Sequence, residues 1–101
     1  MKTDLLHTQN PSLDKLILLR KSDKLSTEVD DETVILDMDS GNYTGLNSVG
    51  TLIWKLLENA ITFSELTQRL TDEYDIDKEI CYAEILPFLN NLLNQKLISI
   101  K

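Results

Sequence analysis

The residues that could carry out catalysis in this sequence are few. His7 is the only histidine and Cys81 the only cysteine among 101 residues. A Cys–His pair is formally available for nucleophilic attack, but no third residue is indicated that would orient the histidine. One cysteine and one histidine also fall short of the ligand set of a zinc site. We therefore predict no catalytic residue, and a small hydrolase that uses Cys81 is the one catalytic alternative.

Carboxylates spaced by two are the other chemically suggestive pattern. Asp37 and Asp39 form one such pair, and Asp75 and Asp77 form another. Such pairs can bind a hard cation, which prefers several oxygen ligands. Both pairs border predicted turns or helix starts, where acidic residues serve as caps and keep the chain solvated. The three glycines form no phosphate-binding fingerprint. We predict neither a metal nor a cofactor.

The charge balance argues against a nucleic-acid partner. The chain has 17 acidic and 10 basic residues, a net charge of −7, whereas phosphate backbones require clusters of Lys and Arg. The longest apolar run, residues 16–19, is too short to span a bilayer, and the N-terminus does not resemble a signal peptide. We expect a cytoplasmic protein without a membrane partner.

The elements that would position any site fall into two regions. Residues 24–46 alternate polar and apolar side chains and contain the turn signals 30–32 and 39–42, which predicts a three-stranded antiparallel meander. Leu25, Thr27 and Val29 would be the buried side of the first strand. Residues 47–97 predict three helices, capped by Asn47 or Ser48, by Thr62 with Glu65, and near residues 75–77. The fold class is therefore α+β.

Two segments are ambiguous. Residues 1–22 could contain a short helix that begins near Pro11, or a strand over the apolar run 16–19. The third helix, from about Lys78 to Gln95, contains Pro87, which predicts a kink near residues 83–87 or a later start. Its inward residues would include Ile80, Ile85, Leu86, Leu89, Leu92, Leu93 and finally Leu97.

The third strand of the meander suggests a binding surface. If residues 43–46 form an edge strand, their free N–H and C=O groups could pair with an extended peptide. A helix that covers this edge is the alternative, in which Gly45 only permits close packing. The strands alone favour the covered edge.

Residues 37–54, DMDSGNYTGLNSVGTLIW, resemble the PqqD-like family, the recognition elements for precursor peptides that are ribosomally made and then modified. The residues that carry the resemblance are Gly41, Tyr43, Gly45, Leu46, Asn47, Gly50, Ile53 and Trp54. The similarity extends over about residues 23–99. The stand-alone length and the Tyr-Thr-Gly-Leu-Asn form resemble most closely the discrete members that serve lasso-peptide pathways.

The resemblance implies a winged helix-turn-helix-like fold, with three antiparallel strands followed by three helices, over residues 23–101. Residues 1–22 would be an N-terminal arm or an extra edge element. The leader segment of a precursor peptide would add as a strand and lie along the third helix. The implied peptide-binding residues are Tyr43, Thr44, Gly45 and Leu46 on the strand, and Ile85, Leu86, Phe88, Leu89 and Leu93 on the helix.

The implied function is recruitment without chemistry. The domain would bind the leader and deliver the peptide to a leader peptidase and a cyclase. A chaperone for a radical-based or other peptide-modifying enzyme is the alternative within the family. A winged-helix nucleic-acid binder is the alternative outside it, but the second helix offers only Arg69 among several acids.

Overall fold

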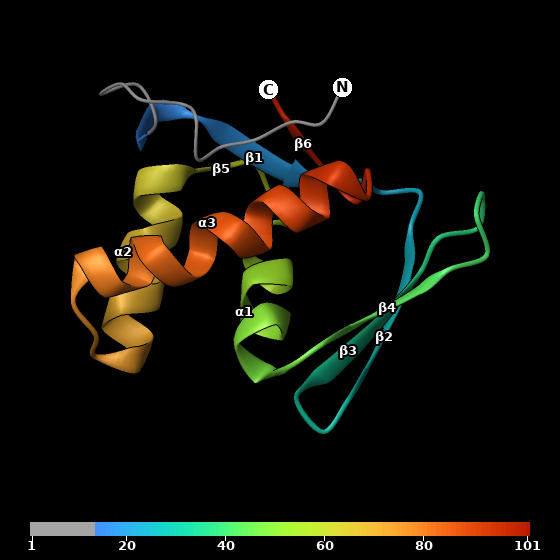
Figure 1. Cartoon of the computed structure of the whole chain (residues 1–101), viewed down its shortest axis with the longest axis horizontal. Helices are drawn as coiled ribbons and strands as arrows, with labels where there is room; N and C mark the ends of the chain where they lie inside the picture. Colours follow the sequence, from blue (N-terminus) through green and yellow to red (C-terminus); the bar gives the residue numbers. More distant parts are fainter. Residues whose placement is uncertain (1–13) are drawn as a thin grey trace.

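The computed structural model describes residues 14–101 and confirms an α+β fold with a three-stranded antiparallel sheet and three helices (Figure 1). The elements in chain order are β1 (Ile17–Arg20), β2 (Leu25–Val29), β3 (Glu32–Leu36), β4 (Tyr43–Leu46), α1 (Ser48–Leu56), β5 (Ile61–Thr62), α2 (Phe63–Tyr74), α3 (Lys78–Asn94) and β6 (Ile98–Ile100). In Figure 1 the sheet β2–β3–β4 extends to the right, away from α2, and β1 lies along the upper side.

The predicted meander forms through two tight turns. Asp30 and Asp31 join β2 to β3 with φ of 52° and 67°, as a two-residue hairpin of the primed type requires. Gly41, with φ of 75°, makes the turn before β4, where glycine avoids the strain of a left-handed conformation. The resulting sheet order is β2-β3-β4, so β3 is central.

The predicted buried side of β2 is wrong, because all five residues of this strand are exposed. Leu25 and Val29 are 57% and 63% exposed, and Ser26, which is also exposed, lies on the side of α1 and accepts a hydrogen bond from Trp54 Nε1 at 3.2 Å. The reason is the register with β3, which pairs Ser26 with Ile35, and Ile35 is fully buried. Alternation predicted the strand correctly, but it does not by itself say which of the two sides is buried.

The three helices begin at side-chain caps or at acidic residues, as predicted. Asn47 Oδ1 accepts from Gly50 N at 2.9 Å and starts α1, and Thr62 Oγ1 accepts from Glu65 N at 3.1 Å and starts α2. Asp77 occupies the N-cap position of α3 without a side-chain cap bond. α3 continues as one helix through Pro87, so the expected later start is wrong.

The core lies between the meander, the helices and β1. Ile53, Trp54 and Leu57 of the α1 region are buried against residues of α2 and α3. Thr33 Oγ1 of β3 donates to Thr51 Oγ1 of α1 at 2.9 Å, and both side chains are buried. This bond satisfies two polar groups that would otherwise lose water without replacement, and it fixes the meander on α1.

A second sheet, which the sequence did not predict, closes the other side of the core. Its order is β5-β1-β6, with both pairings antiparallel. Two further backbone hydrogen bonds connect β1 to the helices. Arg20 N donates to Leu57 O at 2.9 Å, and Phe63 N donates to Leu16 O at 2.8 Å. β1 thus ties together the end of α1, the start of α2 and the C-terminal strand.

The ambiguity in the N-terminal segment is resolved for its last part. Residues 17–20 form a strand rather than part of a helix, and Leu18 is fully buried. β1 is the middle strand of its sheet and not an element added at an edge. The possible helix start at Pro11, and His7 with it, lie outside the described residues.

Between residues 14 and 101, none of the helices combines the length and the apolar character needed to cross a membrane.

Candidate functional site

One flank of β4 carries no strand partner within residues 14–101. β4 pairs with β3 through Thr33–Leu46, Val34–Gly45, Ile35–Thr44 and Leu36–Tyr43, and it is the outer strand of its sheet. Tyr43 is 72% exposed, and Gly45 is also exposed. An added side chain at Gly45 would meet no atom within 4 Å. The alternative in which Gly45 serves close packing is therefore wrong.

The ladder determines which backbone groups of β4 point toward this flank. Asp37 N donates to Asn42 O at 2.9 Å, just before β4. Because bonded and non-bonded pairs alternate along an antiparallel ladder, Thr44 and Leu46 bond to β3. The N–H and C=O groups of Tyr43 and Gly45 then point outward. Two residues, rather than the four predicted, offer main-chain partners to an additional strand.

The helix α3 passes close to both ends of β4. At the first end, Thr44 Oγ1 donates to Gln95 Oε1 at 2.7 Å, and Gln95 Nε2 donates to Asn91 Oδ1 at 2.9 Å. At the second end, Leu46 and Phe88 both approach Gly50, where an added Cβ would lie 3.2 Å from Leu46 Cβ and 3.1 Å from Phe88 Cζ. Gly50 therefore allows β4, α1 and α3 to meet closely.

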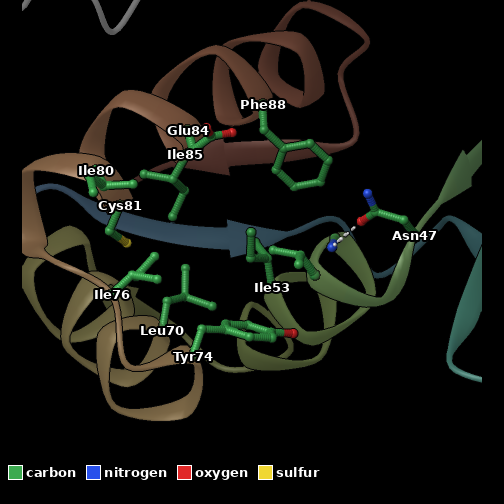
Figure 2. A pocket seen from close by; sticks show the side chains of 12 residues that line it. Asn47, Ile53, Leu70, Tyr74, Ile76, Ile80, Cys81, Glu84, Ile85 and Phe88 are labelled. Atoms are coloured by element: carbon green, nitrogen blue, oxygen red, sulfur yellow. Dashed lines mark hydrogen bonds between the residues drawn. The ribbon is translucent and has the colours of Figure 1, made fainter.

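A cavity of about 470 Å³ begins at this meeting point and continues between α1, α2 and α3. Figure 2 shows Ile85 and Phe88 of α3 directed toward Ile53 of α1, with Leu70 and Tyr74 of α2 on the far side. The complete lining is Asn47, Val49, Gly50, Ile53, Leu70, Tyr74, Ile76, Ile80, Cys81, Glu84, Ile85 and Phe88. The walls are mainly aliphatic and aromatic, as in pockets that receive apolar groups.

The structure brings only two of the five predicted α3 residues to this cavity. Ile85 and Phe88 line it. Leu89 is fully buried in the core and offers no surface to a ligand. Leu86 and Leu93 are partly buried and pack against the core cluster. Leu86 and Phe88 are two positions apart, which corresponds to a rotation of roughly 200° around the helix axis. Leu86 therefore lies on a different side of α3 from Phe88.

Sequence reasoning missed the apolar side chains around the cavity mouth. Val49, Tyr74, Ile76 and Ile80 are 41%, 38%, 37% and 52% exposed, and all four line the cavity. Ile80 was predicted to face the interior. An available signal was the apolar pair Ile76 and Ile80 at the acidic boundary between α2 and α3, where capping and solvation require no apolar residue.

Cys81 lines the cavity, and its surroundings make its thiol less reactive than an exposed cysteine. Its thiol is buried and lies 3.9 Å from Thr67 O. Burial raises the pKa of this thiol, which disfavours the reactive thiolate. This environment opposes the hydrolase alternative.

The comparisons with known proteins agree with this architecture. The PqqD family profile, described as coenzyme PQQ synthesis protein D, matches residues 32–98. A solved structure described as TbiB1 in complex with the TbiA(beta) leader peptide is similar, with a TM-score of 0.74 and 32% identity. The match covers 80% of this chain and 94% of that chain. No curated protein sequence matches. The family profile covers more than half of the chain, and the chain therefore belongs to the PqqD family.

Proposed function

We propose that the chain binds the leader segment of a ribosomally made precursor peptide as an additional strand on β4. The observation that carries this proposal is the flank of β4 that has no strand partner within residues 14–101, toward which the backbone of Tyr43 and Gly45 points. A cavity whose lining begins at Asn47, the residue that follows β4, lies at the end of this strand. The similar structure holds a leader peptide, which supports the same class of ligand here. The binding itself requires no catalytic group.

Main-chain pairing and side-chain burial would contribute differently to this binding. Each new backbone hydrogen bond adds a net contribution of about 0.5–1.5 kcal/mol and tolerates many sequences. An apolar side chain that enters the cavity lined by Ile53, Ile85 and Phe88 would add about 1.5–3 kcal/mol. The strand would provide general affinity, and the cavity would provide selectivity.

We further propose that the bound peptide is delivered to a leader peptidase and a cyclase of lasso-peptide biosynthesis. Holding the leader at a fixed edge raises the effective concentration of the adjoining core peptide near such enzymes. The resemblance of residues 43–47 to the discrete lasso-pathway members supports this client. The match to the PqqD profile also suits a chaperone for another peptide-modifying enzyme. The enzymes encoded beside the chain distinguish the two clients.

The proposal is tested by removing one outward-pointing N–H without changing the core. Gly45→Pro removes this N–H at an edge position that tolerates proline. We expect leader affinity to fall by about tenfold, because one bond is lost and the ring obstructs the added strand. Fluorescence polarisation with the labelled leader of the precursor encoded beside the chain measures the change.

Gly45→Ala is the matched control, since it keeps the N–H and has free space for the methyl group. It should bind the leader as tightly as the unmodified chain does. Equal affinity for the proline and alanine variants, with both domains folded by circular dichroism, would contradict strand addition at β4.

A further inference from the structure

We propose that Glu84 makes this domain selective for peptides that carry a lysine or arginine close to an apolar anchor residue. This inference rests on the proposed function and deepens it, because it names the chemistry of the bound segment. The apolar anchor fills the cavity that begins at the end of β4, and the basic side chain pairs with Glu84 at its rim.

Among the residues that the structure describes, 14–101, Glu84 is the only charged one that lines the cavity. Its side chain is exposed, and within residues 14–101 it takes part in no salt bridge or hydrogen bond. By contrast, Glu65 is paired with Arg69 on α2, and Glu28 is paired with Lys55 on α1. A carboxylate at the rim of an apolar cavity is available to a cation that arrives with a ligand.

The surroundings of Glu84 also favour a cationic ligand. The closest basic residue in sequence, Lys78, lies over the ring of Tyr82 at 5.5 Å, and Tyr82 does not line the cavity. The segment before α3 adds Asp75 and Asp77, and the whole chain has a net charge of −7. This acidic field attracts basic peptides and repels acidic ones.

A basic residue near the anchor fits the walls as well as the charge. Side chains of an extended peptide alternate between its two sides, so neighbouring positions reach different parts of one site. The aliphatic stem of lysine or arginine can lie along apolar surface while its charged end reaches the rim. The exposed side chains of Ile80 and Tyr74 provide this surface at the cavity mouth. One peptide can therefore satisfy both the apolar cavity and the acidic side chain at its rim.

Selection from a random peptide library tests the inference without knowledge of the leader. A display library of extended random peptides is selected against three immobilised domains: the unmodified chain, Glu84→Lys and Glu79→Lys. Glu79 lies on the same helix and outside the cavity lining, so Glu79→Lys makes the same charge change away from the site. Circular dichroism confirms that each domain is folded.

We expect peptides selected by the unmodified chain to combine an apolar residue with Lys or Arg at the next position or the one after it. Glu84→Lys should lose this basic preference and favour Asp or Glu, whereas Glu79→Lys should retain it. For a selected peptide, Lys→Ala should weaken binding to the unmodified chain by about two- to fivefold, the range of exposed ion pairs. The same change should not affect binding to Glu84→Gln.

Two failures are distinguishable. If peptides are enriched without a basic preference, or if both lysine variants shift the preference equally, Glu84 has no selective role and the proposed function stands. If the unmodified chain enriches no peptide at all, the proposed function itself is contradicted.

Discussion

β1 and β4 are both four-residue strands, but their flanks are used in opposite ways. β1 is paired on both sides, by β5 and β6, and Lys21 N at its end donates to Leu97 O at 2.9 Å. β4 is paired on one side within the described residues. The comparison shows that this small domain uses one strand to close its core and leaves one flank of another without a strand partner among residues 14–101.

The largest expected effect comes from disrupting β1. Leu18 is fully buried in the middle strand of the second sheet. We expect Leu18→Ala to lower the free energy of unfolding by about 2–5 kcal/mol, because it removes buried methyl groups and leaves a cavity. Urea denaturation followed by circular dichroism measures the loss.

Leu25→Ala in β2 is the matched control, since Leu25 is 57% exposed. It should change the free energy of unfolding by less than about 0.5 kcal/mol. Similar losses for the two variants would show that β1 is not the more important strand for stability.

A smaller effect is expected at the turn between β2 and β3. Asp31 has φ of 67° in a two-residue hairpin, where glycine is the preferred residue. Asp31→Gly should raise the free energy of unfolding by about 0.5 kcal/mol and leave leader affinity unchanged. Asp31→Ala should lower the free energy of unfolding, because alanine tolerates this left-handed conformation poorly. The prediction fails if the glycine and alanine variants are equally stable by urea denaturation.

The smallest effect concerns the turn before β4 and depends on pH. Lys24 Nζ lies 3.1 Å from Asp37 Oδ1, and Ser40 Oγ donates to Asp37 Oδ2 at 3.0 Å. The hydrogen bond from Lys24, followed by that from Ser40, lowers the pKa of Asp37 below its ordinary value of 3.8. The same hydrogen bond raises the pKa of Lys24 above 10.5.

The sign of the pH dependence follows from these shifts. A lowered carboxyl pKa stabilises the fold above pH 3.8, and this contribution is lost as the pH falls through the folded-state pKa. The contribution of Lys24 is complete below pH 10.5 and is lost above it. The stability difference between the unmodified chain and Asp37→Asn should therefore be constant near neutral pH and shrink in acid. A difference that grows in acid would contradict this assignment.

Local signals explain why much of the meander and helices was predictable. Asn47 caps α1, Thr62 caps α2 and Gly41 forms a turn, and each of these residues acts within a few positions of itself. The order of three consecutive strands, which in meanders are neighbours, left an open or a covered edge at residues 43–46 as alternatives, and the family resemblance favoured the open edge.

Features that depend on long-range packing were not predictable. β5 and β6 have only two and three residues, and their pairing with β1 depends on contacts far along the chain. The outward face of Leu25 follows from the register with β3. The rotation of α3, which buries Leu89 and exposes Ile80, is set by the whole core rather than by the pattern of one helix.

Amide hydrogen exchange along β4 tests the central claim most directly. In the free domain, the amides of Thr44 and Leu46 should exchange slowly because they bond to β3, and those of Tyr43 and Gly45 should exchange rapidly. Saturation with the leader should slow the exchange of Tyr43 and Gly45 by about tenfold or more. Rapid exchange of both amides in the saturated complex, or slow exchange before the leader is added, would contradict strand addition at this edge.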